Sequence, residues 1–240
     1  MEFTELLKTE LKPLYKELLQ SVTDYGEIAP FCLQWGKDYP LSPNEGLLFI
    51  GRATNGWVSD STDIEELFGN GKYAIFARKD QMKWVNNLEG NKDPKGYNTR
   101  KSAFWRVIKQ VSEKVYPDKW YDNIAWSNLC KIAPSEGGNP SDSLYYSQLK
   151  DCRLILKKEI EILSPKYVIM LVGQNWAKDF MRYLNDNQET HRIETIRWGN
   201  YEVIAYAIKG TIYLISEHPM GKPEQVHIEV LNSLISNLHI

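Results

Sequence analysis

The sequence predicts an α/β fold, a three-layer α/β/α sandwich around a central and mainly parallel sheet. Helical and strand patterns alternate along the 240 residues, which is typical of a sheet covered by helices on both faces. The run 167–173 is apolar almost without interruption, as in a strand whose two faces are both buried. The length fits one domain over residues 1–240, with the helix 2–21 as an N-terminal extension.

Apolar residues at helical spacing predict the helices of the N-terminal half, and short apolar runs predict its strands. We expect helices at 2–21 and 102–116 and strands at 46–51 and 124–129. The segment 58–100 has no sustained periodicity, and we expect it to be irregular.

The C-terminal half begins with a loop over 131–141 and a long helix over 142–163. Ser141 or Asp142 is suited to cap this helix, and Pro165 ends it. The remaining predicted elements are a strand at 167–173, a helix at 175–184, a hairpin of 193–198 and 201–207 around Gly199-Asn200, a strand at 211–216 and a helix at 223–238.

Composition excludes several classes of protein. The three cysteines, Cys32, Cys130 and Cys152, are far apart and too few for a four-cysteine zinc or iron–sulfur site. We interpret them as reduced packing residues of a cytoplasmic protein, and we expect no metal and no cofactor. No apolar run approaches the ~20 residues that span a bilayer, and the first residues lack a signal-peptide pattern, so no membrane contact is expected.

Positive charge is concentrated in one segment, although the net charge of the chain is −2. Residues 71–120 contain twelve Lys or Arg and five Asp or Glu, so this segment carries +7. Such a segment can neutralise phosphates if its cations lie on one face, and Arg100 and Lys101 are its candidate contacts. The alternative is a solvated loop with lysines scattered around it.

Polar side chains lie at or after the ends of three predicted strands. Gly51 to Gly56 has the glycine spacing of a phosphate loop, but Trp57 replaces the required lysine, which argues against a nucleoside triphosphatase. Asn128 carries both a donor and an acceptor and can read a pyrimidine edge; alternatively, it caps the following turn. His218 follows the last strand, where an imidazole can donate a hydrogen bond to an oxygen that gains charge. The other three histidines are expected to be surface or packing residues.

Three motifs occur in the order found in a known family. The first is the strand and loop at 47–57; the second runs from Asn128-x-x-Lys131 through a loop and helix to Leu163-Ser164-Pro165-Lys166 and a strand; the third is His218-Pro219. Over roughly residues 45–235 the chain resembles the uracil-DNA glycosylase superfamily. The resemblance implies the fold of that family and a DNA glycosylase that flips uracil or a related damaged base out of single- or double-stranded DNA.

The resemblance also implies roles for single residues. Asn128 would recognise the base, His218 would stabilise the departing base, and either Asn55 or Thr54, following Gly51, would position the attacking water. Met220 would be the apolar wedge, and Lys131 joins Arg100 and Lys101 as an expected DNA contact. The aromatic that stacks on the base would be Trp57, Phe68 or Phe76.

Departures from the family pattern leave other functions open. Ala53 occupies the position where the family usually carries an acid or asparagine, although Asp60 or Asp63 could substitute for that group. An alternative is therefore an inactive or re-purposed member that binds nucleic acid or a nucleotide. A third possibility is an unrelated hydrolase that uses His218 with Asp60 or Glu217, but it lacks a recognisable nucleophile.

Overall fold

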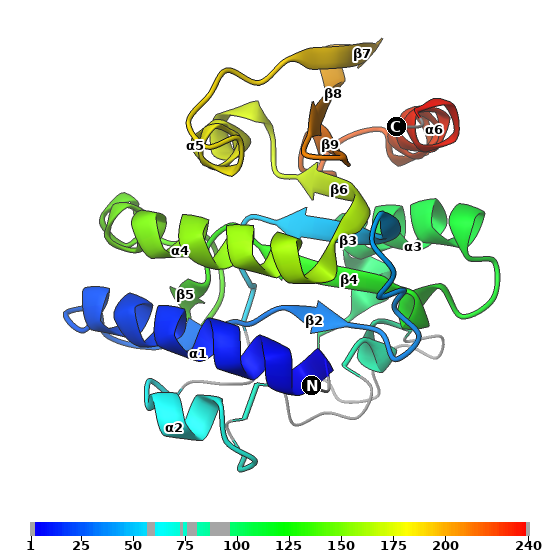
Figure 1. Ribbon diagram of the computed structural model, residues 1–240. Helices are drawn as coiled ribbons and strands as arrows, with labels where there is room; N and C mark the ends of the chain where they lie inside the picture. Colours follow the sequence, from blue (N-terminus) through cyan, green and yellow to red (C-terminus); the bar gives the residue numbers. More distant parts are fainter. Residues whose placement is uncertain (1–2, 57–60, 73, 76–80, 87–96, 239–240) are drawn as a thin grey trace. The chain divides into compact units, whose positions relative to one another are not determined.

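The computed structural model describes residues 3–56, 61–72, 74–75, 81–86 and 97–238 (Figure 1). The chain divides into two compact units. Unit 1 comprises residues 1–34, 51–79 and 127–163, and unit 2 comprises residues 35–50, 80–126 and 164–240. The expectation of one domain over the whole chain stays a prediction.

A seven-stranded sheet dominates the fold. Its strands, in spatial order, are β2 (Gln34–Trp35), β4 (Ile124–Asn128), β3 (Glu45–Gly51), β6 (Pro165–Leu171), β9 (Thr211–Ser216), β8 (Tyr201–Ile208) and β7 (Arg192–Trp198). β6 pairs in parallel with both β3 and β9, whereas β8 pairs antiparallel with β9 and β7. The α/β class and the parallel centre of the sheet are therefore confirmed, and so is the predicted hairpin of β7 and β8.

The helices of unit 2 are α3 (Ala103–Val115), α5 (Gln174–Leu184) and α6 (Glu224–Asn237). Figure 1 shows α5 and α6 on opposite sides of β9 and β8, so strands form the middle of three layers here, as predicted. Before the strand β4, the described residues also form three short 3-10 helices: η1 (Lys83–Val85), η2 (Thr99–Lys101) and η3 (Trp120–Asp122).

The central strand β6 begins and ends two residues earlier than the apolar pattern predicts. Val168 to Leu171 are fully buried, which explains their continuous apolar run. Val172 and Gly173 both donate their backbone N–H groups to the carbonyl of Ser216. Gly173, with φ of 85°, then starts α5 in a conformation that glycine adopts without strain.

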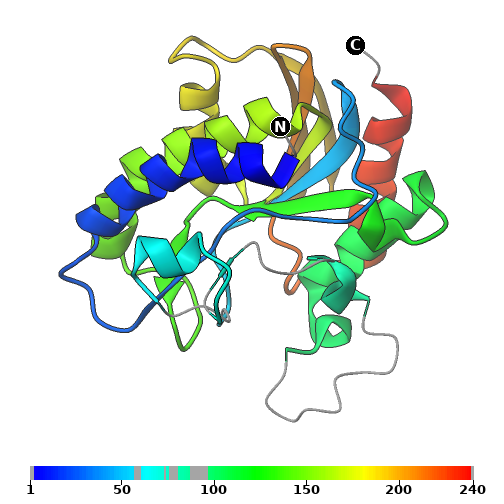
Figure 2. The ribbon, with the colours of Figure 1, turned by 60° about the horizontal axis from the view of Figure 1, so that its bottom comes forward.

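Unit 1 is built on two long helices, α1 (Phe3–Ser21) and α4 (Asp142–Leu163), which lie side by side (Figure 2). A shorter helix, α2 (Ile64–Leu67), also packs against α1. The loop predicted at 131–141 instead begins with a short strand, β5 (Ile132–Pro134), which pairs antiparallel with β1 (Ile28–Pro30). Both strands read Ile-Ala-Pro and are too short to show any periodicity in sequence.

Candidate functional site

Two of the predicted strand ends meet in unit 1. β3 ends at Gly51, whose carbonyl accepts a hydrogen bond from the N–H of Leu129 at 2.9 Å. The next carbonyl, of Arg52, accepts from the N–H of Cys130 at 2.8 Å. The loop after β3 and the segment after β4 are therefore joined by backbone hydrogen bonds, directly beside Asn128.

Asn128 and Thr54 are buried polar side chains with unused hydrogen-bonding capacity. Asn128, the last residue of β4, is 1% exposed, and Thr54 is 3% exposed. Within the part of the chain that the structure describes, neither the Nδ2 of Asn128 nor the Oγ1 of Thr54 has a hydrogen-bond partner. Because these two atoms lie on segments that are hydrogen-bonded to each other, a single ligand could supply the partners that both lack.

Asn55 differs from Thr54, the other residue expected to position water. Its side chain is exposed, and its Oδ1 accepts a hydrogen bond from the N–H of Gly138 at 3.1 Å. The neighbouring Gly137 has φ of 102°, and a Cβ added there would lie 2.6 Å from the same Oδ1. Asn55 therefore braces one loop against another, and glycine at 137 makes this contact possible.

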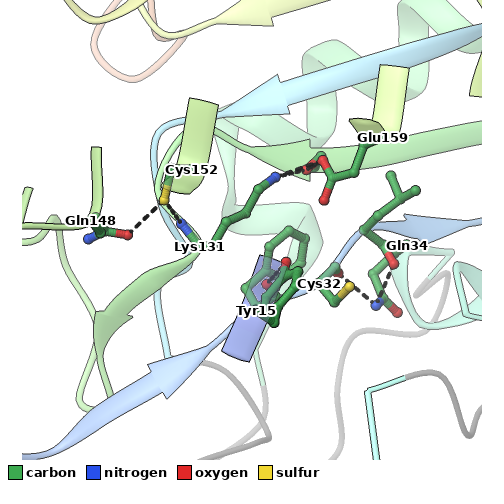
Figure 3. A network of polar contacts seen from close by, with 10 residues as sticks. Tyr15, Cys32, Gln34, Lys131, Gln148, Cys152 and Glu159 are labelled. Carbon is green, nitrogen blue, oxygen red and sulfur yellow. Dashed lines mark hydrogen bonds and ion pairs between the residues drawn. The ribbon is translucent and has the colours of Figure 1, made fainter. Parts of the chain in front are cut away.

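Lys131 lies in the core of unit 1, where it forms a polar cluster with Ser127 and Glu159. Its Nζ donates to Ser127 Oγ at 2.6 Å and to Glu159 Oε2 at 2.7 Å, and Ser127 Oγ donates to the same Oε2 at 2.7 Å. Figure 3 shows the Lys131 side chain reaching Glu159 of α4. Because Lys131 and Glu159 are both 0% exposed, the prediction that Lys131 contacts DNA is wrong: its ammonium has no route to a phosphate.

α4 also holds the backbone that follows Asn128 (Figure 3). The N–H of Lys131 donates to Cys152 Sγ at 3.3 Å. Gln148 accepts from the N–H of Ile132 and donates to its carbonyl, both at 2.9 Å. Three α4 side chains, Gln148, Cys152 and Glu159, therefore face this segment.

The three cysteines are buried thiols of unit 1. Burial raises the pKa of Cys152 to about 12, and it raises the pKa values of Cys32 and Cys130 as well. Since the thiolate is the reactive form, these side chains act as packing groups, as the sequence predicts.

His218 belongs to unit 2 and follows the end of β9. It is half-buried, and its ring stacks on Phe104 of α3, with centroids 6.0 Å apart and planes 14° apart. The backbone N–H of Met220 donates to its Nδ1 at 3.3 Å. Because Nδ1 accepts this bond, the neutral ring carries its proton on Nε2.

α6 is tied to the elements around His218 by two polar contacts. Glu224, in its first turn, accepts hydrogen bonds from both Nε and Nη2 of Arg106 in α3, and these bonds lower the pKa of Glu224. His227 lies 2.6 Å from the hydroxyl of Ser216 at the end of β9, and its ring stacks on Trp198. Burial lowers the pKa of His227 to about 4, so this histidine is neutral and serves packing.

The remaining predicted site residues belong to both units. Met220 is 71% exposed, as an apolar wedge requires. Arg100 and Lys101 are exposed in η2, and Arg100 lines a groove of about 470 Å³ together with Trp105 and Lys109 of α3. The ring of Phe68 is buried 5.5 Å from that of Tyr15 in unit 1. Trp57 and Phe76 lie outside the described residues, as does Asp60.

Part of the charge in the basic segment is neutralised locally. Arg106 pairs with Glu224, and Lys109 lies 3.6 Å from Glu113 within α3. Among the described residues, no three His, Cys, Asp or Glu side chains are grouped so that they could bind a metal ion. None of the described helices is both long and apolar enough to span a membrane.

Sequence reasoning missed Ser127, Glu159 and Phe104. A signal for Glu159 was present in the sequence. Residues 148, 152, 155 and 159 are spaced by four, three and four positions, so they share one face of α4, and this face is buried. A carboxylate on such a face requires a buried partner. Lys131, which lies between the apolar residues Cys130 and Ile132 in the sequence, was a candidate for this buried partner.

Comparisons with known proteins give one finding on the family. No curated protein matches the chain. The sequence model of the Uracil DNA glycosylase superfamily matches residues 40–222, well over half of the chain and a span that includes Gly51, Asn128 and His218. The chain therefore belongs to the Uracil DNA glycosylase superfamily, as the order of its three motifs predicts.

Proposed function

We propose that this protein is a DNA-repair glycosylase that removes uracil or a related damaged base from DNA by hydrolysing the N-glycosidic bond. The observation that carries the proposal is the buried amide of Asn128, whose Nδ2 has no partner among the described residues, beside the loop after β3. A base flipped out of the duplex supplies the missing partner: its carbonyl oxygen accepts from Nδ2, and its ring N–H donates to Oδ1.

In the proposed reaction the bond between C1′ of the sugar and the base nitrogen breaks. Its electron pair leaves with the base, and the charge spreads onto a carbonyl oxygen. The Nε2–H of His218 stabilises this oxygen by donating a hydrogen bond. Water adds its hydroxyl to C1′ and its proton goes to the base, so the products are the free base and an abasic site.

We assign the positioning of this water to Thr54 rather than Asn55. The hydroxyl of Thr54 is buried and unengaged within the described residues, whereas the Oδ1 of Asn55 is occupied by Gly138. The Thr54 hydroxyl is neutral, so it orients the water but does not deprotonate it. The bond to the base is therefore largely broken before the water attacks C1′.

The test is a cleavage assay on single- and double-stranded oligonucleotides that each contain one uracil, followed by alkali. We expect strand cleavage at the uracil with the wild-type protein. His218→Ala should lower turnover by about 10²–10³-fold, the usual effect of losing one oxyanion donor, while leaving DNA binding nearly intact. The exposed His191 provides a matched control, and His191→Ala should keep full activity. Equal activity of His218→Ala and wild type would show that His218 does not take part in the reaction.

A second candidate function is binding without hydrolysis. Ala53, where the family usually carries an acid or asparagine, and the engaged side chain of Asn55 favour it. The same oligonucleotides distinguish the two functions, because a binding module retains uracil-containing DNA in a gel-shift assay yet leaves it resistant to alkali.

A further inference from the structure

Ser127, Lys131 and Glu159 form a cluster that we call the polar clamp. Two of its members, Ser127 and Lys131, lie on either side of Asn128 in the sequence. Ser127 directly precedes Asn128, and Lys131 follows it by three residues. Both side chains converge on a single oxygen, Oε2 of Glu159, at 2.7 Å. The two ends of the Asn128 segment are thus attached to one point on α4.

The segment is also fixed by its backbone. Leu129 and Cys130 donate to the carbonyls of Gly51 and Arg52, and the N–H of Lys131 donates to Cys152. Successive side chains of a strand point to opposite faces, so Ser127 and Asn128 diverge at the end of β4. Ser127 faces α4, and the Asn128 amide takes no part in the hydrogen bonds of the clamp.

Stability alone does not account for a buried ion pair at this place. Removing two charges from water costs several kcal/mol per ion, and apolar residues of similar volume are often as stable or more stable. Glu159 is not fully compensated either, because its Oε1 has no partner among the described residues. Unlike apolar contacts, the directional bonds of the clamp fix the positions of Ser127 and Lys131 relative to α4.

We propose that the polar clamp is a positioning device for Asn128, which holds the amide in one orientation before the base arrives and so sets which base edge it accepts. The inference rests on the proposed function and deepens it. Ser127, Lys131 and Glu159 touch no substrate and act through Asn128. A donor held in advance loses no free energy to ordering when the base binds.

The test uses Ser127, because its hydroxyl can be removed without leaving a charge unpaired. Ser127→Ala deletes the hydroxyl, and Ser127→Thr keeps it. The control is Ser112→Ala: Ser112 is 0% exposed in α3, and its hydroxyl has no partner among the described residues. We expect all three proteins to fold, with Ser112→Ala unchanged in activity.

The first readout is the side-chain amide signal of Asn128 in a ¹⁵N–¹H spectrum, assigned by its loss in Asn128→Ala. Wild type and Ser127→Thr should each give one pair of resonances. Ser127→Ala should give broadened or doubled resonances, since the amide then samples several orientations. This readout does not require activity, so it tests the clamp even in a protein that excises nothing.

The second readout is kinetics on uracil-containing DNA. Ser127→Ala should lower kcat by between about tenfold and 10²-fold, with KM little changed because contacts to the DNA backbone remain. Ser127→Thr should restore kcat. Discrimination between uracil and cytosine should fall in Ser127→Ala alone.

The outcomes separate the two proposals. A wild-type protein that releases no base overturns the proposed function, and the amide signal then decides on the clamp. An active wild type beside a Ser127→Ala protein with an unchanged signal and rate overturns the clamp and leaves the proposed function standing.

Discussion

Asn128 and Thr54 each have a buried hydrogen-bonding group that a ligand could engage. A buried donor or hydroxyl without a partner costs about 1–3 kcal/mol of stability. In unit 1 two such atoms occur on segments that are joined by the backbone bonds of Gly51 and Arg52. The protein bears this cost in the unliganded state, and a bound base with its water would recover it.

Replacing Thr54 separates its role from that of Asn55. Thr54→Val keeps the shape of the side chain and removes the hydroxyl, so the free energy of unfolding should stay equal or rise, since a buried unpaired group is lost. Single-turnover excision should fall by at least about tenfold if the hydroxyl orients the water, and Thr54→Ser should restore it. A Thr54→Val protein that keeps full activity while Asn55→Ala loses it would reverse the assignment.

At the scale of elements, α6 connects the parts of unit 2 that surround His218. It contacts α3 through Glu224 and Arg106, and it contacts the end of β9 through His227 and Ser216. α3 in turn supplies Phe104, on which the His218 ring stacks. The orientation of His218 therefore depends on a stacking partner, Phe104, that is distant from it in sequence.

His227 should make the stability of the protein depend on pH. Its folded pKa of about 4 lies below the ordinary value of 6.5, so between these values the unfolded chain binds a proton that the folded chain does not. The free energy of unfolding should fall by about 3 kcal/mol as the pH decreases from 6.5 to 4. Urea unfolding over this range should show a weaker pH dependence in His227→Gln, which keeps a hydrogen-bonding group toward Ser216. Identical slopes in the two proteins would contradict the shift.

The ion pair between α3 and α6 should contribute little to stability. Both side chains are partly exposed, at 38% for Arg106 and 29% for Glu224, and solvent screens such pairs. Glu224→Gln should lower the free energy of unfolding by about 1 kcal/mol or less at low salt, with the difference shrinking in 1 M salt. A loss of several kcal/mol would show that the pair is a main support of unit 2.

The sequence predicts those elements whose pattern is long and local. α4 has the predicted bounds, and the Gly199-Asn200 turn locates the hairpin, because both depend on neighbouring residues. β1 and β5 were missed because three residues show no period, and their pairing links positions about a hundred residues apart. The same reason explains Lys131: its burial depends on Glu159, which only the folded chain brings within reach.

At the scale of the whole molecule, residues 71–120 carry a net charge of +7, whereas the rest of the chain is net acidic. If residues of that stretch neutralise phosphates, DNA binding must weaken as salt rises, because bound counterions are released. The described part of the stretch presents Arg100 and Lys101 on the surface, next to the groove beside α3.

The double variant Arg100→Ala/Lys101→Ala tests this contribution. The slope of log K against log salt for binding to uracil-containing DNA should become shallower by about 2, since each lost phosphate contact contributes about 0.9. Lys178→Ala/Arg182→Ala on α5 removes the same charge elsewhere and should leave the slope almost unchanged. Equal slopes in both double variants would remove Arg100 and Lys101 from the DNA contacts.

All three cysteines of the chain lie buried in unit 1, and unit 2 contains none. A thiol-reactive dye therefore records when unit 1 opens and is insensitive to motion confined to unit 2. Labelling rates measured with and without DNA would then report whether unit 1, which carries Asn128, becomes more resistant to opening when the ligand is bound.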